Sequence, residues 1–317
     1  MNMFKTHRLV YLIGFSLTFI SVCRAQQPSV QRSWYGLEPA AELETKAKPY
    51  ASAFFSKLGS LTRFGMAISD DNNECYFAVA LNDNGLFREE IRVTRRQKDG
   101  NWTKPLPLLP EEKKYKYVDP HFSPDGKRMY FIYTKPADEK KLSNRQRFDI
   151  WYVQRDGNGW SDPVNVPSPI STPDANEYYV SLTSQLKIFF GSNRADGNNF
   201  DLYSASLGTD GRYQQPVPLP GKVNTRGYEA DVFVAPDESY LIFCSSGRPD
   251  GFGQYDLYVS FKDSSGNWSE GKNLGERVNT KREEFAPSIS RDQKALFFSS
   301  GGAIHWISTS VVEELRP

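Results

Sequence analysis

Residues 117–133 read YVDPHFSPDGKRMYFIY, and residues 229–245 repeat the same frame as EADVFVAPDESYLIFCS. The frame recurs around residues 177–191 and 284–299, and more faintly around residues 63–78. It contains a short strand, a turn and a second strand rich in aromatic residues. A unit that recurs at a fixed period indicates a repeat architecture. The scaffold that such repeats build does not by itself name a ligand.

The second strand of each repeat carries a pair of bulky apolar residues, and these pairs define the period. From one pair to the next, the steps are 54, 59, 53 and 55 residues. A unit of this length holds four short strands with their turns, and such units arranged radially form a β-propeller. We therefore predict an all-β chain in which each repeat is one four-stranded blade. The pairs begin at Tyr76, Tyr130, Phe189, Ile242 and Phe297.

Turn and strand signals inside the repeat fit this assignment. In the SPDG turn at residues 123–126, proline presets the first corner and aspartate can bond its own backbone two residues on. We expect the tryptophans that follow an exposed turn to mark the fourth strand and to pack between blades. The third strands open with Asp149, Asp201 and Asp256, and the tryptophans are Trp102, Trp160 and Trp268.

The repeat resembles the PD40, or WD40-like, propeller repeat, as in TolB-like propellers. SPDGK at residues 123–127 matches the frame of that family in full, and Arg194 and Arg248, each followed by DLY, match its later part. The resemblance spans roughly residues 63–308 and implies a propeller fold. It implies no particular activity, and the partners of TolB itself are not carried over.

Five anchor pairs favour five blades. The fifth repeat lacks a fourth strand, and residues 33–37 look like the last strand of a blade. Borrowing that strand would close the ring and remove two exposed strand edges. We therefore predict a closing blade shared by N- and C-terminal strands. A sixth blade built from residues 26–62 is the alternative, although EPAAEL at residues 38–43 is not strand-like.

An N-terminal leader precedes the repeats. Basic residues near the start are followed by an apolar run at residues 9–22, too short for a typical membrane span. Small residues then predict signal-peptide cleavage after Ala25. An uncleaved anchor is one alternative. Lipid attachment at Cys23 is disfavoured, because Val22 stands where a small residue is expected.

Cleavage there divides the chain into three segments. Residues 1–25 are the signal peptide, residues 26–59 form an N-terminal segment with the closing strand, and residues 60–317 form the propeller. Export predicts a periplasmic or secreted protein without membrane insertion, in a compartment that permits disulfides. Only Cys75 and Cys244 then remain, in repeats that are not neighbours in a ring of five. We expect two separate buried thiols.

Composition argues against several classes of function. The chain has 39 basic and 38 acidic residues and a net charge of +1, so nothing favours nucleic acid or an anionic membrane surface. After the expected cleavage only His121 and His305 remain, and no Gly-x-Ser-x-Gly elbow appears. We therefore predict no hydrolase triad, no metal site and no cofactor. The Asp- and Gly-rich loops at residues 193–199 and 248–253 lack the spacing of a calcium loop and are interpreted as turns.

The candidate ligand-binding residues lie at the starts of the inner strands, which approach the central channel in a propeller. We expect acids to ring the channel, with Arg63 as counter-charge and His121 in the wall. These acids could bind a polar ligand or a cation, or serve as acid and base in glycoside hydrolysis. Alternatively, each accepts backbone N–H groups of a neighbouring blade, which their recurrence with the repeat favours. The acids are Asp119, Glu177, Glu229, Asp231 and Glu284.

Two functions from different classes remain open. We favour an exported, non-catalytic binding or scaffold protein that recognises a protein or cell-envelope partner, polysaccharide included, through one propeller face. The absence of a visible nucleophile supports this choice, and no catalytic residue is assigned. The alternative is a carbohydrate-active enzyme, a glycosidase or lyase, that uses the channel acids. Aromatic residues make up 14% of the chain and could stack on sugars.

Overall fold

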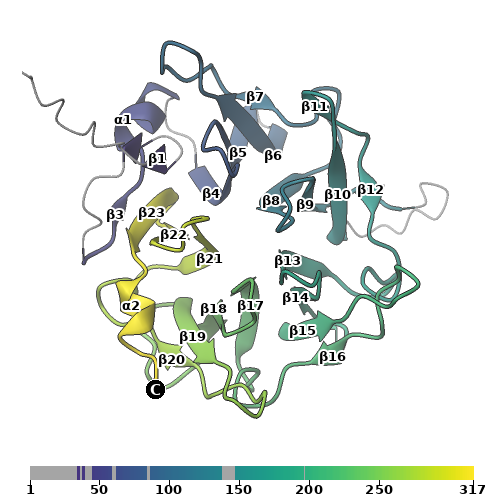
Figure 1. The fold of residues 1–317 in the computed structure, drawn as a ribbon, viewed down its shortest axis with the longest axis vertical. Coiled ribbons are helices and arrows are strands. Elements are labelled where there is room, and N and C mark those ends of the chain that lie inside the picture. The colour runs from purple at the N-terminus through teal and green to yellow at the C-terminus, as the bar shows by residue number, and fades with distance from the viewer. Residues whose placement is uncertain are drawn as a thin grey trace, which may run out of the picture. The chain divides into compact units, whose positions relative to one another are not determined.

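The computed structural model describes residues 34–35, 38–39, 45–58, 62–83, 86–137, 147–195 and 197–317. These residues form five blades arranged in a ring, a β-propeller in which each blade runs from an inner strand at the channel to an outer strand at the rim (Figure 1). Every pair of neighbouring strands within a blade is antiparallel. The predicted fold class and blade count are confirmed, and the six-blade alternative is excluded.

The blades follow one another along the chain, and their strands are as follows. Blade 1 contains β4 (Thr62–Ile68), β5 (Glu74–Asp83), β6 (Leu86–Arg95) and β7 (Leu106–Pro107). Blade 2 contains β8 (Tyr117–Phe122), β9 (Arg128–Tyr133) and β10 (Asp149–Asp156), with β11 (Gly159–Trp160) and β12 (Val164–Asn165) both paired to β10. Blade 3 contains β13 (Glu177–Leu182), β14 (Ile188–Ser192), β15 (Asp201–Ala205) and β16 (Val217–Pro218).

The last two blades complete the ring. Blade 4 contains β17 (Tyr228–Val234), β18 (Tyr240–Ser246), β19 (Asp256–Phe261) and β20 (Lys272–Asn273). Blade 5 contains β21 (Glu284–Ile289), β22 (Ala295–Ser300), β23 (Ala303–Ser308) and β3 (Lys48–Pro49). The remaining elements are β1 (Trp34–Tyr35), β2 (Glu38–Pro39), α1 (Ser52–Phe55), the 3-10 helix η1 (Ser56–Leu58) and α2 (Ser310–Glu313).

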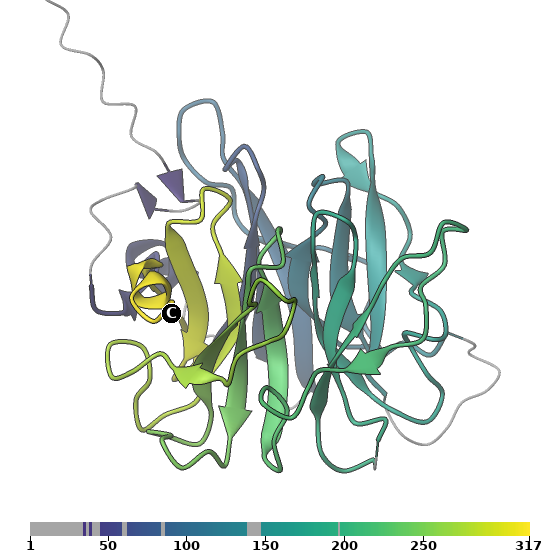
Figure 2. The ribbon, with the colours of Figure 1, turned by 60° about the horizontal axis from the view of Figure 1, so that its bottom comes forward.

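Blade 5 is closed by an N-terminal strand, as predicted, but the strand is β3 and not residues 33–37. Figure 2 shows the purple N-terminal elements beside the yellow strands of blade 5. The ring centroid of Tyr50 lies 5.1 Å from that of Phe297 and 5.4 Å from that of Trp306. The backbone N–H of Tyr50 donates to the Ile304 carbonyl at 2.8 Å. Because this aromatic anchor follows β3 directly, β3 is held at the edge of the sheet. In contrast, β1 turns back and pairs with β2.

Aromatic packing holds the blades together. The second-strand anchors Phe77, Phe189 and Phe297 are at most 2% exposed. Trp268 of blade 4 packs against Phe189 of blade 3 with ring centroids 6.3 Å apart. Trp160 of blade 2 packs against Tyr76 of blade 1 in the same way, at 6.2 Å. The tryptophans therefore pack between blades as predicted, although they lie in the hairpin before the fourth strand.

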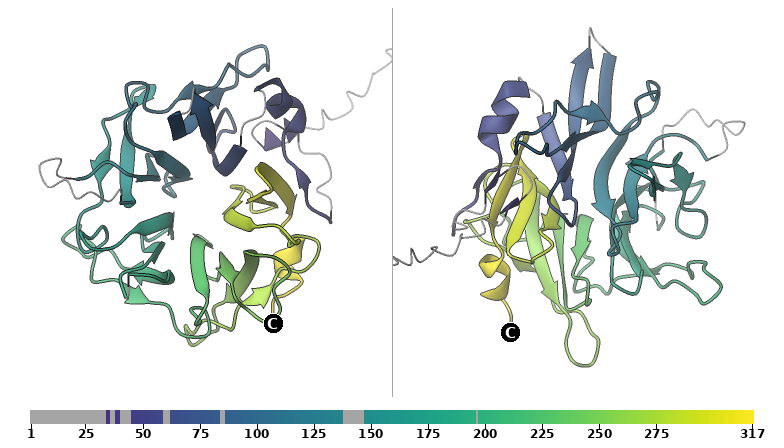
Figure 3. Two further views of the ribbon diagram at one scale, coloured as in Figure 1. Left: turned by 180° about the vertical axis from the view of Figure 1, so that it is seen from behind. Right: turned by 45° about the horizontal axis from the view of Figure 1, so that its top comes forward.

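The two ends of the channel differ in what covers them. We call the end that carries the turns between first and second strands the turn face. There the Lys127 N–H donates to Asp125 Oδ1 at 3.1 Å, which is the turn chemistry expected for SPDG. We call the opposite end, where connections between blades enter the inner strands, the loop face. The hairpin of β5 and β6 extends beyond its neighbours on that side (Figure 3).

Several predictions concern residues at or near the N-terminus. The signal peptide, the cut after Ala25 and lipid attachment at Cys23 lie outside the described residues. No helix in the described part of the chain is long and apolar enough to cross a membrane. Cys75 in blade 1 and Cys244 in blade 4 are both buried free thiols, as predicted.

Candidate active site

Each inner strand carries one β-bulge, and the bulges bring five residues to the wall of the channel. One residue at each bulge has a φ between 46 and 58°. Such a backbone costs of order 1–3 kcal/mol for a residue with a Cβ. Because all five blades share the bulge, it belongs to the fold and re-aims one side chain per blade. From blade 1 to blade 5 these residues are Gly65, Asp119, Tyr179, Asp231 and Ala286.

Two of the five bulge residues are carboxylic acids, and both side chains are half-buried. Burial and the neighbouring carboxylates of Asp231 and Glu89 hold the pKa of Asp119 well above its usual value. Burial also raises the pKa of Asp231 to about 6, although the N–H of Ala286 opposes this by donating to Asp231 Oδ2 at 3.1 Å. Asp119 therefore holds its proton more firmly than Asp231 does. Two carboxyl groups with separated pKa values can act as acid and base.

The space beside Asp119 depends on a glycine. A Cβ placed on Gly65 would lie 2.9 Å from Asp119 Oδ1, so a side chain there would press on the carboxyl group. Glu89 of the long strand β6 is a third acid near this point, and its Oε2 lies 3.1 Å from Lys116 Nζ. Its negative charge helps to keep Asp119 protonated.

The three glutamates of the predicted ring lie elsewhere. Glu177, Glu229 and Glu284 are 0% exposed and precede the bulge by two residues. Glu229 accepts the N–H and hydroxyl of Thr225 at 2.9 and 2.7 Å and the Ser245 hydroxyl at 2.9 Å. The other two make the same contacts, with Thr172 and Ser192 and with Thr280 and Ser300. The predicted ring of five acids on the channel is therefore corrected: these three fasten the connections between blades.

Two arginines complete these buried contacts. Arg194 Nη2 lies 3.1 Å from Glu177 Oε1, and Arg248 Nη2 lies 3.3 Å from Glu229 Oε1. Burial raises the pKa of Glu177 to about 7, and the charge of Arg194 opposes that rise. Arg63 occupies the equivalent position in blade 1, opposite Val79 on β5. Its side chain lies outside the described residues, so the predicted counter-charge stays a prediction.

Five half-buried aromatic rings lie in a continuous row at the loop face, across blades 2 to 4; we call this row the aromatic arc. Successive ring centroids are 4.7, 5.0, 5.4 and 5.4 Å apart. Burial and the charges of Asp119 and Asp231 raise the pKa of Tyr178, so its hydroxyl stays protonated next to the acid pair. In order, the arc consists of Phe148, Tyr178, Phe200, Tyr228 and Tyr255.

Tyr179 crosses the channel. It belongs to blade 3, and its hydroxyl donates to the Pro287 carbonyl of blade 5 at 2.9 Å, so the ring bypasses blade 4. The Tyr179 side chain is 3% exposed. The wall of the pocket at the turn face, which we call the turn-face pocket, includes Ser288 next to Pro287 but neither Asp119 nor Asp231. The Tyr179 ring therefore links blade 3 to blade 5 next to this pocket.

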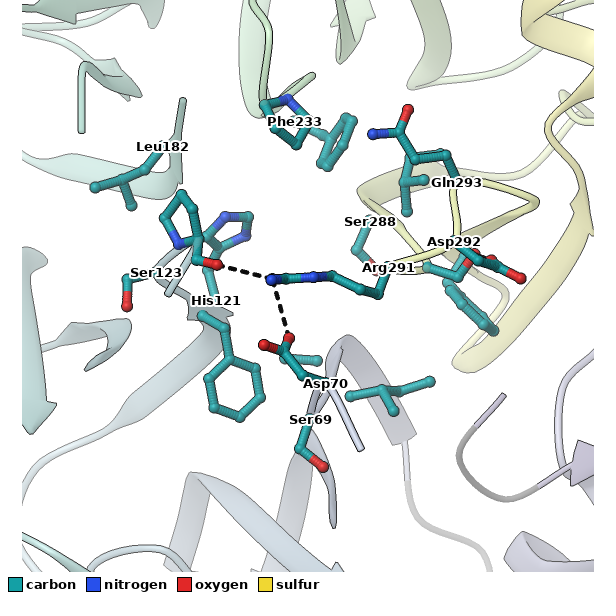
Figure 4. A pocket seen from close by; sticks show the side chains of 18 of the residues that line it. Ser69, Asp70, His121, Ser123, Leu182, Phe233, Ser288, Arg291, Asp292 and Gln293 are labelled. Carbon is teal, nitrogen blue, oxygen red and sulfur yellow. Dashed lines mark hydrogen bonds and ion pairs between the residues drawn. The ribbon is translucent and has the colours of Figure 1, made fainter. Parts of the chain in front are cut away.

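The turn-face pocket has a volume of about 580 Å³ (Figure 4). Arg291 reaches across its mouth, with Nη1 3.0 Å from Asp70 Oδ1 and 2.8 Å from the Pro124 carbonyl oxygen. His121 lines the wall, and its Nε2 lies 3.5 Å from Ser181 Oγ. Burial lowers the pKa of His121 to about 4, so the ring is neutral at pH 7. His121 thus lines the turn-face pocket, whose wall includes neither aspartate.

Sequence analysis missed the aromatic arc, Glu89 and Tyr179. A signal for part of the arc was present, because an aromatic residue directly precedes the aspartate that opens the third strand in three repeats. These residues are Phe148, Phe200 and Tyr255. Within the described ranges, no three His, Cys, Asp or Glu side chains gather as a metal site would require.

Comparisons with known proteins agree with the propeller fold. No family model and no curated protein matches the chain. A solved structure described as a glycoside hydrolase matches with a TM-score of 0.52 and 8% identity, over 78% of this chain and 87% of that one. An arabinanase from Bacillus subtilis matches with a TM-score of 0.49 and 13% identity, over 78% and 94% of the two chains. A gluconolactonase from Xanthomonas campestris matches with a TM-score of 0.45 and 13% identity, over 77% and 71%.

At 8% identity the match with a TM-score of 0.52 supports the fold and establishes no substrate. It nevertheless stands against the function favoured from sequence. That function was a non-catalytic scaffold, whereas the match with a TM-score above 0.5 is a glycoside hydrolase. The finer PD40 assignment has no matching family model behind it.

Proposed function

We propose that the protein is a glycoside hydrolase that uses Asp119 and Asp231 as its acid and base. The observation that carries this proposal is the pair itself. Two half-buried carboxyl groups share one end of the channel, at bulge positions where the other blades have no acid. Glycoside hydrolysis requires two such groups, one protonated and one ionised.

The two environments favour different roles for the two groups. Asp119 has carboxylates around it and keeps its proton, so it donates that proton to the leaving glycosidic oxygen. Asp231 accepts the N–H of Ala286, which favours the ionised form, so it activates water or attacks the anomeric carbon. As the leaving oxygen takes the proton from Asp119, the developing positive charge on the sugar ring faces the Asp231 carboxylate.

Hydrolysis of a polysaccharide panel tests this proposal. Arabinan, xylan, galactan and β-glucan are incubated with mature protein, and new reducing ends are measured. We expect release from at least one polymer, and a loss of roughly 10²- to 10⁴-fold in Asp119→Asn and Asp231→Asn. Asp162→Asn, an exposed aspartate in the connection before β12, is the matched control and should retain full activity.

The outcomes separate three situations. Release that depends on both aspartates supports the proposal. Products with a new double bond would replace it with a lyase mechanism. Release that survives in both variants, or no release from any polymer or chromogenic glycoside, would overturn it.

We also propose that the protein is exported and that its repeats are of the PD40 type. The leader before Ala25 supports export, and the SPDGK match at residues 123–127 supports the repeat type. N-terminal sequencing of protein recovered from the medium or periplasm should begin at Gln26. A start at Met1 in the cytoplasm would contradict export.

A further inference from the structure

We propose that the aromatic arc is a binding platform for a neutral polysaccharide chain, which it leads to the Asp119–Asp231 pair. The inference rests on the proposed glycoside hydrolase function and names the substrate class of that site. It goes further by predicting that the bound polysaccharide extends across blades 2 to 4. Such an enzyme recognises a polymer and not only a terminal sugar.

Exposure distinguishes the arc from the aromatic packing inside the blades. Anchor rings such as Phe189 and Phe190 are 0% exposed, whereas every ring of the arc is half-buried. Large apolar surface left partly open at a protein surface marks a contact site for another molecule. The rings lie beside carboxyl groups and phenols, and this combination of flat apolar faces with polar groups suits a pyranose or furanose ring.

The backbone under the arc is rigid. The Glu177 N–H donates to the Phe148 carbonyl at 2.8 Å, and the Glu229 N–H donates to the Phe200 carbonyl at 3.0 Å. The same bond joins Glu284 to Tyr255 at 2.8 Å. The buried glutamates therefore fix the three repeat positions of the arc. Preorganised contacts bind a flexible chain with less loss of entropy.

Two tyrosines link these fixed positions to the acid pair. Tyr178 lies between Phe148 and Phe200, and Tyr228 lies between Phe200 and Tyr255. Burial and nearby carboxylates raise the pKa of both tyrosines, so both keep a hydroxyl that can donate to sugar oxygens. The arc thus passes close to the acid pair at Tyr178 and Tyr228.

The negative charges near the arc favour a neutral polysaccharide over an acidic one. The carboxyls of Asp119, Asp231 and Glu89 lie near Tyr178, within the arc, and Lys116 is engaged by Glu89. A chain of uronic acids would bring more negative charge to these carboxyls, and like charges repel. A neutral polysaccharide meets no such cost.

Affinity electrophoresis tests the inference without requiring hydrolysis. Full mature protein is run through native gels containing arabinan, xylan, galactan, β-glucan or the acidic control polygalacturonate. We expect retardation by a neutral polymer, roughly tenfold weaker binding in Tyr228→Ala, and a smaller loss in Tyr228→Phe, which keeps the ring but lacks the hydroxyl. Phe252→Ala is the matched control, because Phe252 is 47% exposed in a neighbouring loop of blade 4 but outside the arc. Thermal unfolding checks that each variant is folded.

The kinetic arm compares chain lengths. Tyr228→Ala should lower kcat/KM roughly tenfold on long oligosaccharides and by a smaller factor on a chromogenic monosaccharide glycoside. Ring-dependent binding without any hydrolysis would uphold the platform and overturn the proposed hydrolase. Hydrolysis with unchanged binding and unchanged length dependence in folded Tyr228→Ala would overturn the platform alone. Retardation only by polygalacturonate would overturn the choice of a neutral chain.

Discussion

The two sets of acids around the channel differ in exposure, partners and relation to the repeat. Glu177, Glu229 and Glu284 recur at one position of the repeat, are fully buried and have their oxygens bonded by threonine and serine. Asp119 and Asp231 stand at another position, half-buried at the channel, with raised pKa values. Only a few residues of sequence separate the two sets.

The difference teaches how a repeat fold combines stability with chemistry. Three of the five blades use the same glutamate fastening, so this stabilising group recurs with the repeat. Acid–base chemistry needs two unequal groups, so a reacting pair breaks the repeat. Removal of a glutamate should therefore affect folding, and removal of an aspartate should affect activity.

The largest expected effect is on the stability of Glu229→Ala. Arg248 has a side chain only 7% exposed and would lose its ion pair, and the Thr225 N–H and Ser245 hydroxyl would lose their acceptor. Breaking a buried ion pair costs about 3–5 kcal/mol. Urea denaturation should show this loss, whereas Glu276→Ala, at an exposed acid, should stay within about 0.5 kcal/mol of wild type. Equal stability of the two variants would remove the structural role assigned to the glutamates.

The next effect is the pH dependence of kcat/KM. The base Asp231 must be ionised, so activity should fall roughly tenfold per pH unit below about pH 6. The acid Asp119 must be protonated, so activity should also fall at high pH, once Asp119 loses its proton. We expect a bell-shaped profile whose alkaline side disappears from the residual activity of Asp119→Asn. A profile flat through pH 6 would contradict the role of Asp231.

Replacing an aspartate of the pair should not lower the stability of the protein at neutral pH, unlike replacing one of the buried glutamates. The folded pKa of Asp231, about 6, lies above its unfolded value of about 3.9. Its contribution to the free energy of unfolding is therefore present below pH 3.9 and is lost as pH rises through 6. Asp231→Asn removes this dependence. At neutral pH it should be at least as stable as wild type, in contrast with Glu229→Ala.

A smaller effect is expected from Gly65→Ala. The new Cβ would lie 2.9 Å from Asp119 Oδ1 and would displace the acid, at a positive φ that costs about 1 kcal/mol for alanine. Ala286 already tolerates this backbone at the same position of blade 5, so the protein should still fold. We expect kcat to fall severalfold with little change in KM. Unchanged kcat, with Ala286→Gly as control, would show that Asp119 needs no such space.

The fold was predictable because each repeat carries its own signals. The anchor pairs, the SPDG turn and the blade-packing tryptophans act locally, so five copies in one chain reinforced one another. The closing strand was misplaced because its pairing depends on distant partners. Tyr50 holds β3 by contacts with Phe297 and Trp306, about 250 residues away. No sequence signal near residues 48–49 predicts these contacts.

The site was predictable only in its residue types. The sequence placed Asp119 and Asp231 with the glutamates, because all five acids lie near the starts of inner strands. Alignment on the bulge would have separated them, since each glutamate precedes the bulge by two residues. The bulge is a backbone feature shared by Gly, Asp, Tyr and Ala, so no residue type reveals it. The aromatic arc and Tyr179 arise from contacts between blades and require the assembled ring.

The smallest effect should come from Tyr179→Phe, which tests the link between blades 3 and 5. The variant loses one hydrogen bond, from the Tyr179 hydroxyl to the Pro287 carbonyl, worth about 1 kcal/mol. The ring itself stays, so activity should be near wild type. Tyr179→Ala removes a buried ring close to both aspartates and lets water reach the acids. We expect a lower pKa for Asp119, seen as an alkaline side of the kcat/KM profile that shifts to lower pH, because desolvation is the first cause of the raised value. An unshifted profile in a folded Tyr179→Ala protein would mean that blades 1, 2 and 4 alone enclose the acids, and that Tyr179 belongs with the glutamates as a fastening of the ring.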